Sequence, residues 1–471
     1  MLISTEPDRF EKLRALSTMA ADDIIARPSA KTKFREDYVV PGDGRTYRAP
    51  YSRPERNPMP GVYRASMPNG KFINLMRVMF TDFCMMDCHF CPNSHWVPRR
   101  RFAYKVDELA RTFNELHERN TVSGLFLSSG IMGSGASHTT EKMVQVVDVL
   151  RNRYKFRGYV HLKVMPGTEK GTVEAAHRLG TRLSVNIETP DDTRLKRLSP
   201  MKDFKTGILE PMRWIDQFTR AKTGATVGQA TQMIVGAAEE SDADILARMD
   251  QLYSDWKLKR VYFVPFRPVR YTPMEEHPPT PSEREQRLYQ MDWLKRVYHF
   301  KDTEIRMAFD SQGFLDLDQD PKTVIALESI DRFPVDLNTA DLNTLLRTPG
   351  IGPVSADRIL RHRRRFRIDN WRDLQAMGVV RKKATPFVVF SGHRPEHGRQ
   401  LRLELLGHAE PRGSVDLADL KTERGLAARA SGTPARSTTA SPATCGVQGT
   451  CTGCPLYGAP GHPGSRELAH A

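Results

Sequence analysis

The sequence of 471 residues contains only six cysteines, and they stand in two groups of three. This scarcity and grouping exclude a disulfide framework and favour metal ligation in a reducing compartment. No run of about 18 apolar residues occurs, so we expect no membrane span. The first residues, Met1 to Glu6, contain neither a basic leader nor an apolar core, and predict no signal peptide. We therefore expect a cytoplasmic protein.

Acidic residues are also too few to balance the basic ones. Asp and Glu number 56 against 71 Lys and Arg, which gives a formal net charge of +15. Such an excess favours a polyanionic partner, although a basic surface without such a partner is the alternative. A chain of this length suits two or three domains.

The first cysteine group has the spacing Cys-x3-Cys-x2-Cys over Cys84, Cys88 and Cys91. One short loop with this spacing presents three thiolates to three irons of a cubane cluster and leaves the fourth iron open for a chelating ligand. A zinc site completed by His89 or His95 is the alternative. Structural zinc loops, however, more often use paired Cys-x2–4-Cys units. The spacing therefore predicts an iron–sulfur cluster.

Short apolar runs alternate with amphipathic stretches from about residue 72 to residue 297. The apolar runs lie at 72–79, 125–128, 159–164, 183–187, 230–235 and 260–265. The helical patterns lie near 106–119, 140–153, 172–179, 208–221, 242–255 and 283–297. Six strand–helix units in order predict an α/β fold, a partial (β/α)6 barrel with helices outside its parallel sheet. The cysteine loop follows the first strand, where catalytic loops of such folds gather.

Composition divides the chain further. The expected parts are an N-terminal extension (1–60), the barrel (61–310), a small all-α domain (311–395), a flexible linker (396–443) and a Cys-rich tail (444–471). Within the extension, Glu11 to Ile25 has helical periodicity. The stretch from there to Gly61 is rich in Pro, Arg and Gly, and predicts either an irregular basic wrap or a loop.

The cysteine loop also resembles a known family. Cys84 to Cys91, with the aromatic Phe90 before the last cysteine, matches in full the Cys-x3-Cys-x-aromatic-Cys signature of the radical S-adenosylmethionine (SAM) enzymes. The resemblance implies a [4Fe-4S] cluster that binds SAM and cleaves it to a 5′-deoxyadenosyl radical, which abstracts a hydrogen atom. It also implies the partial barrel, Phe90 beside the adenine, and an electron donor such as flavodoxin or ferredoxin.

Three further stretches resemble SAM-contacting motifs of that family. Ser128, Ser129 and Gly130 follow the second strand, where the family often has Gly-Gly-Glu. Ile234, Gly236 and Glu239 resemble its Gly-x-Ile-x-Gly-x-x-Glu element, with Gln in place of the first Gly. Asn186 and Glu188 follow the fourth strand and are candidates for the ribose hydroxyls, although an exposed loop carboxylate is the simpler interpretation of Glu188.

A different pattern occupies residues 336–360. Apolar residues at helical spacing flank the turn Gly350-Ile351-Gly352, whose isoleucine anchors the turn and whose glycines allow a phosphate to approach the backbone. Arg358 and Arg361 add positive charge. The pattern resembles the helix-hairpin-helix motif of DNA repair and DNA-uptake proteins. A protein–protein helical hairpin is the alternative.

A second, degenerate hairpin is predicted at 374–384, where Arg381, Lys382 and Lys383 follow the turn. Two copies would pack as one four-helix unit that grips both strands of a duplex. Contacts of this kind go to phosphates, so they position a protein on DNA without reading its sequence.

The tail contains the second cysteine group, Cys445, Cys451 and Cys454. Its spacing suits a second iron–sulfur cluster, with an open iron or with His462 as a fourth ligand. A Cys3His zinc site and redox-active thiols are the alternatives. Metal ligation is the interpretation that the spacing favours.

The two motifs together resemble radical SAM proteins described as DNA modification or repair proteins, over residues of about 60–395. We therefore expect an enzyme that docks on DNA and presents a nucleotide, flipped or already distorted, to the barrel. Two alternatives remain open. One is a radical SAM enzyme that modifies RNA, for example transfer RNA; the other is an iron–sulfur redox or scaffold protein that binds DNA without catalysis.

Overall fold

The computed structural model describes residues 7–20, 34–39, 46–50, 61–66 and 72–393. The linker (396–443) and the tail with Cys445, Cys451 and Cys454 lie outside these ranges. The expected N-terminal helix is α1 (Arg9–Met19), and its predicted last residues also lie outside the description. Strands β1 (Phe34–Val39) and β2 (Thr46–Pro50) pair antiparallel in the stretch expected to be a basic wrap or loop.

A seven-stranded sheet, in the order β3-β4-β5-β6-β7-β8-β9, forms the centre of the fold. Its strands are β3 (Val62–Ser66), β4 (Phe72–Met79), β5 (Gly124–Ser128), β6 (Tyr159–Lys163), β7 (Arg182–Ser184), β8 (Gln229–Val235) and β9 (Arg260–Pro265). Strands β4 to β9 are parallel, which confirms the partial (β/α)6 barrel. Strand β3 pairs antiparallel with β4 and was not predicted.

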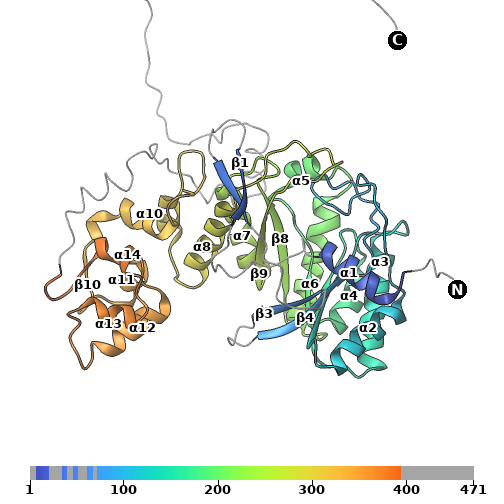
Figure 1. Ribbon diagram of the computed structural model, residues 1–471, viewed down its shortest axis with the longest axis horizontal. Helices are drawn as coiled ribbons and strands as arrows, with labels where there is room; N and C mark the ends of the chain where they lie inside the picture. The colour runs from blue at the N-terminus through green and yellow to red at the C-terminus, as the bar shows by residue number, and fades with distance from the viewer. Residues whose placement is uncertain (1–6, 21–33, 40–45, 51–60, 67–71, 394–471) are drawn as a thin grey trace, which may run out of the picture. The chain divides into compact units, whose positions relative to one another are not determined.

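Helices follow each parallel strand and cover the outside of the sheet (Figure 1). They are α2 (Val106–Glu118), α3 (Ala136–Asn152), α4 (Lys170–Leu179), α5 (Asp192–Leu198), the π-helical turn η2 (Phe204–Leu209), α6 (Glu210–Ala221), α7 (Asp242–Trp256) and α8 (Ser282–Arg296). Their apolar residues recur every three or four positions, as Leu109, Phe113 and Leu116 do in α2, so each helix buries one face in the main core. Among the described residues, no helix is long and apolar enough to cross a membrane.

The barrel core continues beyond α8. Helix α9 (Asp302–Ile305), the turn η3 (Arg306–Ala308) and helix α10 (Pro321–Glu328) contribute Ile305, Ala308 and Ile325 to it. A separate core begins at Leu337 and holds the helical region that follows.

Two helical hairpins share this second core. The elements of the helical region are η4 (Ile330–Arg332), β10 (Val335–Asp336), α11 (Leu342–Arg347), α12 (Pro353–His362), α13 (Trp371–Ala376), α14 (Arg381–Ala384), η5 (Thr385–Phe387) and β11 (Val388–Val389). The turn residue Ile351 of the first hairpin and Val379 of the second are both buried in it. The predicted degenerate hairpin is thus present. The short strands β10 and β11 pair parallel and join the two ends of the region.

The hairpins pack through their turn glycines. Gly350 has φ +78°, and its carbonyl accepts a hydrogen bond from the Val380 amide at 2.9 Å. A Cβ at Gly350 would lie 2.6 Å from the Val380 carbonyl and 3.0 Å from the Ala384 amide nitrogen. Gly378 has φ +89° and faces Ser355 of α12 in return. Each turn therefore needs glycine to approach the other hairpin.

We expect Gly350→Ala to loosen the contact between the hairpins by about 2 kcal/mol, because the alanine would be strained at positive φ and would overlap the second turn. Amide hydrogen exchange in α12 and α14 should become about 30-fold faster. Gly171→Ala in α4 is the matched control, since a Cβ there meets no atom within 4 Å. Equal exchange rates for the two variants would contradict this account.

Candidate active site and nucleic-acid interface

The carboxyl ends of the parallel strands open into one cavity of about 1350 Å³. Each of the six parallel strands contributes to its wall at or just beyond its end, through Cys84 after β4, Ser129 after β5, Met165 after β6, Asn186 after β7, Ile234 in β8 and Phe266 after β9. Loops at this end of a parallel barrel can be varied without disturbing the sheet. The cavity is therefore the candidate active site.

All three cysteines of the first group line this cavity. Cys88 is buried, and Cys84 and Cys91 are half-buried. The Ile131 amide donates to Cys84 Sγ at 3.4 Å, and the Asn93 amide donates to Cys91 Sγ at the same distance. Hydrogen bonds of this type to the sulfurs tune the potential of an iron–sulfur cluster.

The donor set fits a cubane cluster better than a single ion. In the described ranges, no three His, Cys, Asp or Glu side chains converge closely enough to bind one metal ion. A cubane cluster does not need such convergence, because each thiolate binds a different iron. Three thiols on one cavity wall, two of them receiving amide hydrogen bonds, meet this requirement.

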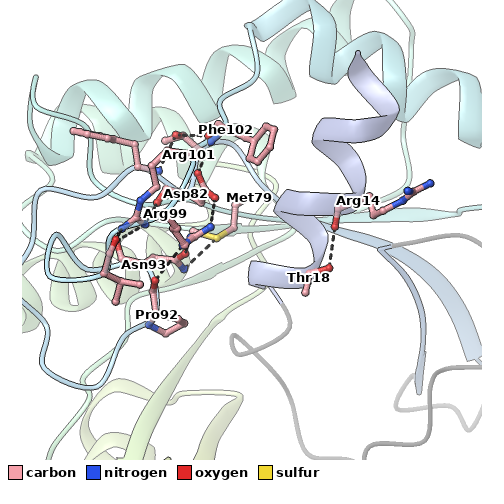
Figure 2. A network of polar contacts seen from close by, with 12 residues as sticks. Arg14, Thr18, Met79, Asp82, Pro92, Asn93, Arg99, Arg101 and Phe102 are labelled. Atoms are coloured by element: carbon pink, nitrogen blue, oxygen red, sulfur yellow. Dashed lines mark hydrogen bonds and ion pairs between the residues drawn. The ribbon is translucent and has the colours of Figure 1, made fainter. Parts of the chain in front are cut away.

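Two arginines brace the loop that carries the cysteines (residues 80–101, the cluster loop), as Figure 2 shows. Arg99 pairs with the fully buried Asp82 at 2.7 Å and donates to Asn93 Oδ1 at 2.5 Å. Arg101 donates to four backbone carbonyls, those of Asp82, Asn93, Ser94 and Val97, at 2.8 to 3.1 Å. The residues before Cys84 are thereby tied to those after Cys91.

The other side of the cluster loop is tied to the segment that follows α5. The Asp87 carboxylate accepts from the Ser199 hydroxyl at 2.6 Å and from the Met201 amide at 3.2 Å. The Ser199 hydroxyl also lies 3.6 Å from Cys88 Sγ. These contacts bring residues more than 100 positions apart to one wall, and they carry Lys202 into the cavity.

Lys202 is a functional candidate that the sequence analysis missed. It is buried and pairs with Glu188 at 3.0 Å, and its ammonium lies 5.7 Å from the centre of the Phe90 ring. Burial alone lowers the pKa of Lys202, but Cys88, Glu188 and Cys91 outweigh burial and raise it above its usual value. Burial raises the pKa of the Cys88 thiol, and Lys202 opposes that rise. A fixed positive charge therefore stands beside the thiols.

Most of the predicted SAM contacts lie on the cavity wall: Phe90, Ser129, Gly130, Asn186, Glu188 and Ile234. Phe90 packs on the apolar cluster that contains Ile234, so these two residues form one patch. A Cβ at Gly130 would overlap the carbonyl oxygen of Phe83 and would lie 2.9 Å from the Cβ of Cys84. Glycine at this position thus allows β5 and the cluster loop to approach each other. The Gly130 amide donates to the Thr81 carbonyl at 2.7 Å and is not directed at a ligand.

Three predicted contacts do not line the cavity: Ser128, Gly236 and Glu239. Ser128 is fully buried. Glu239 has φ +58°, is 79% exposed and pairs with Arg197 at 2.5 Å. The buried carboxylate of this turn is the next residue, Glu240, which accepts from the amides of Gly236 and Ala238. Glu240 therefore has a structural part in the turn.

The first hairpin opens into the same cavity. Its turn residues Gly350, Ile351 and Gly352 line the wall together with Lys322 of α10 and Tyr298. Lys322 donates to the Ile351 carbonyl at 2.6 Å and lies 4.8 Å from the centre of the Tyr298 ring. Burial lowers the pKa of Lys322 to about 7. No spacing in the sequence marks Lys322, because α10 meets the hairpin only in the folded chain.

The five predicted cationic contacts of the hairpins are all exposed. Arg361 pairs with Asp357, and Arg381 stacks on Trp371 with 5.4 Å to the ring centre. Arg358 and Lys383 are held by other groups, Arg358 by the Met377 carbonyl at 3.4 Å and Lys383 by Asp320 at 2.9 Å. Of these five residues, only Lys383 lines the cavity.

Comparisons with known families agree with both sites. The model of the radical SAM superfamily matches residues 78–264, and a helix-hairpin-helix model matches residues 332–385. The chain therefore contains a radical SAM domain followed by a helix-hairpin-helix motif. The first implies a [4Fe-4S] cluster and SAM and supports SAM-dependent enzyme activity, and the second suggests nucleic-acid binding.

Similar solved structures are distant. Methylornithine synthase (PylB) is 17% identical over 45% of this chain and 59% of its own, with a TM-score of 0.37. HydG, a maturase of the [FeFe]-hydrogenase, is 13% identical over 46% of this chain and 49% of its own, with a TM-score of 0.37. A radical SAM methyltransferase from Sphaerobacter thermophilus is 14% identical over 56% and 80%, with a TM-score of 0.32. Similarity at this level carries no information about substrate. Comparison with curated proteins finds no match.

The bracing of the cluster loop can be tested with two neighbouring arginines. We expect Arg101→Met to shorten the lifetime of the reconstituted cluster in the presence of an iron chelator about tenfold, because four carbonyls lose their donor. Arg100→Met is the matched control, since Arg100 is exposed, lies 3.9 Å from Glu11 and 5.1 Å from the centre of the Phe102 ring, and donates to none of these four carbonyls. The lifetime is read from the loss of iron and sulfide with time. If both variants keep the cluster as long as the wild type, the arginine does not hold the loop.

Proposed function

We propose that this protein is a radical SAM enzyme that acts on DNA and repairs or modifies a nucleotide. One observation carries the proposal: the turn of the first hairpin and the three cysteines of the cluster loop line a single cavity. A nucleic-acid strand held at the hairpin would therefore have a path to the thiols inside the protein. A base within a duplex cannot follow this path, so the target must be flipped out or already unpaired.

The cysteines Cys84, Cys88 and Cys91 would hold the cluster. When bound, a [4Fe-4S] cluster and SAM supply a 5′-deoxyadenosyl radical that abstracts hydrogen. The apolar patch of Phe90 and Ile234 suits the adenine ring, and the polar pair Asn186 and Glu188 suits the ribose hydroxyls.

The DNA interface in this proposal consists of the turn Gly350-Ile351-Gly352 and the cationic residues around it. These groups offer contacts to phosphates and no set of side chains that reads base edges, so binding should not depend on sequence. The chain has 71 basic and 56 acidic residues, and this basic excess supports a polyanionic partner. A cytoplasmic location and a flavodoxin or ferredoxin as electron donor belong to the same proposal.

The Cys-rich tail remains a candidate for a second metal site. Its spacing favours a second iron–sulfur cluster over a zinc site or free thiols. The six cysteines of the chain all belong to the two groups, so the iron content can assign both sites without interference from other thiols.

Iron content and SAM cleavage test both assignments. We expect the Ala variants of Cys84, Cys88 and Cys91 each to abolish release of 5′-deoxyadenosine after anaerobic reconstitution, because the cluster loses a ligand. The triple Ala variant of Cys445, Cys451 and Cys454 should keep this activity while its iron falls from about eight to about four per chain.

Single variants of the first group that still cleave SAM would refute the radical SAM assignment. Four irons in both the wild type and the triple variant would assign the tail to zinc or thiol chemistry. A wild type that binds DNA but never cleaves SAM would instead be a scaffold.

A second prediction concerns the hairpin and its buried lysine. Burial lowers the pKa of Lys322 to about 7; the cations Arg347 and Lys383 add to this effect and Asp320 opposes it. The lysine is charged below that pH and neutral above it, so duplex affinity should fall as pH rises from about 6 to about 8. We expect Lys322→Met to remove this dependence and to leave the affinity at the higher pH nearly unchanged.

Lys382→Met is the control, because loss of this exposed positive charge should lower affinity equally at both pH values. Affinity is measured by fluorescence anisotropy of a labelled duplex at fixed salt, with RNA as competitor. A pH dependence that survives in Lys322→Met would exclude this residue from the interface. Stronger competition by RNA than by duplex DNA would indicate an RNA substrate.

A further inference from the structure

Helix α8 turns one complete face toward the cavity. The residues on this face recur every three or four positions along the whole helix, at Ser282, Glu285, Gln286, Tyr289, Gln290 and Trp293. The face is polar and aromatic, in contrast to the buried face of α2, which is mainly apolar. A helix face of this composition inside a cavity is suited to a ligand that has both flat rings and hydrogen-bonding edges.

The face extends from one functional site to the other. Near its start, the Thr280 amide donates to the Phe266 carbonyl at 2.9 Å, which places the beginning of α8 at the end of β9. Beyond its end, Tyr298 reaches the hairpin, where a Cβ on Gly352 would lie 3.3 Å from the Tyr298 hydroxyl. Fifteen residues of helix span about 22 Å. The face therefore forms a wall between the barrel mouth and the hairpin turn.

Several groups on this wall are free to bind a ligand. Trp293 is 48% exposed although it lines the cavity. Within the described ranges, neither the Trp293 indole nor the Gln286 amide has a hydrogen-bond partner. Gln290 accepts a hydrogen bond from Arg287 at 3.1 Å, which orients its amide and leaves the NH2 group available. Tyr289, by contrast, is held by the backbone of Phe263, at 2.9 Å to the amide and 3.2 Å to the carbonyl.

The charge of the cavity matches an anionic occupant. Its wall carries six cationic side chains, Lys163, Lys202, Arg260, Arg267, Lys322 and Lys383, and three acidic ones, Glu188, Glu285 and Asp320. A positive groove combined with exposed aromatic rings is the usual composition of a site for single-stranded nucleic acid. Two glutamine amides beside an exposed indole add hydrogen-bonding groups for base edges.

We propose that the α8 face is a track for a short unpaired stretch of the DNA strand that runs from the hairpin turn to the cluster loop, with one base stacked on Trp293. A single flipped nucleotide is too short to bridge a wall of about 22 Å, so several consecutive nucleotides must leave the duplex. Gln286 and Gln290 bind the edges of these bases. The inference rests on the proposed function, since it requires DNA at the hairpin.

The test compares two DNA probes of equal length and charge, a fully paired duplex and the same duplex with a central bubble of about five unpaired nucleotides. The wild-type holoenzyme should bind the bubble more tightly at fixed salt. Trp293→Ala should weaken binding of the bubble about tenfold, because a stacking contact is lost, and should leave affinity for the paired duplex within about twofold. Trp293→Phe should retain most of the preference, since a ring remains. Intrinsic tryptophan fluorescence that is quenched by the bubble only in the wild type provides a second readout.

Phe72→Ala is the matched control, because Phe72 is an exposed aromatic residue of β4 that does not line the cavity. Its affinities should equal those of the wild type. Equal binding of both probes by the wild type would overturn the track while the proposed DNA function stands. A Trp293→Ala variant that loses affinity for both probes to the same extent would show that Trp293 has a structural role. That result would also overturn the track. Absence of binding to either probe would refute the DNA function itself.

Discussion

The position of the cluster loop depends on the buried carboxylate of Asp82. This residue is fully buried two positions before Cys84, and a carboxylate in such a place is stable only when it is paired. Arg99 supplies the charge, and the Phe102 amide donates to its other oxygen at 2.6 Å. Removing Arg99 would leave an uncompensated buried charge, so the ion pair favours this conformation of the loop. The same side chain thereby fixes the residues on both sides of the cysteines.

A second constraint comes from contacts between segments that are far apart in the sequence. The Asp87 carboxylate and the Ser199 hydroxyl join the cluster loop to the segment after α5, and that segment carries Lys202 to Glu188. The hairpin is held in a comparable way, because Lys322 binds the Ile351 carbonyl and Arg347 pairs with Glu304 at 2.6 Å. Charged side chains therefore fasten both functional loops to the barrel, and each of these charges is at least partly buried and has a partner. Exposed pairs would contribute little to such positioning.

The sequence was sufficient for features that depend on local pattern. The six parallel strands were predictable from alternating apolar runs and helical periodicities, and the cluster loop and both hairpins from the spacing of cysteines and glycines. Strand β3 was not predictable, because it follows a Pro-rich stretch and is defined by its pairing with β4. Glu239 shows another limit: motif spacing points to it, but the backbone at φ +58° turns its side chain to solvent and Glu240 is buried instead. Lys202 and Lys322 acquire their roles from tertiary contacts and have no local signature.

The two hairpin turns differ in the residue that follows the buried aliphatic side chain, and this difference bears on how a strand is held. In the first turn Gly352 follows Ile351, whereas in the second turn Val380 follows Val379. A valine side chain there, 50% exposed, covers the backbone that a glycine leaves open to a phosphate. Phosphate approach is therefore favoured at the first turn, which is also the turn that Lys322 contacts within the cavity. An interface that holds one strand more closely than the other suits an enzyme that must lead one strand away from the duplex, and it supports a path for that strand along α8.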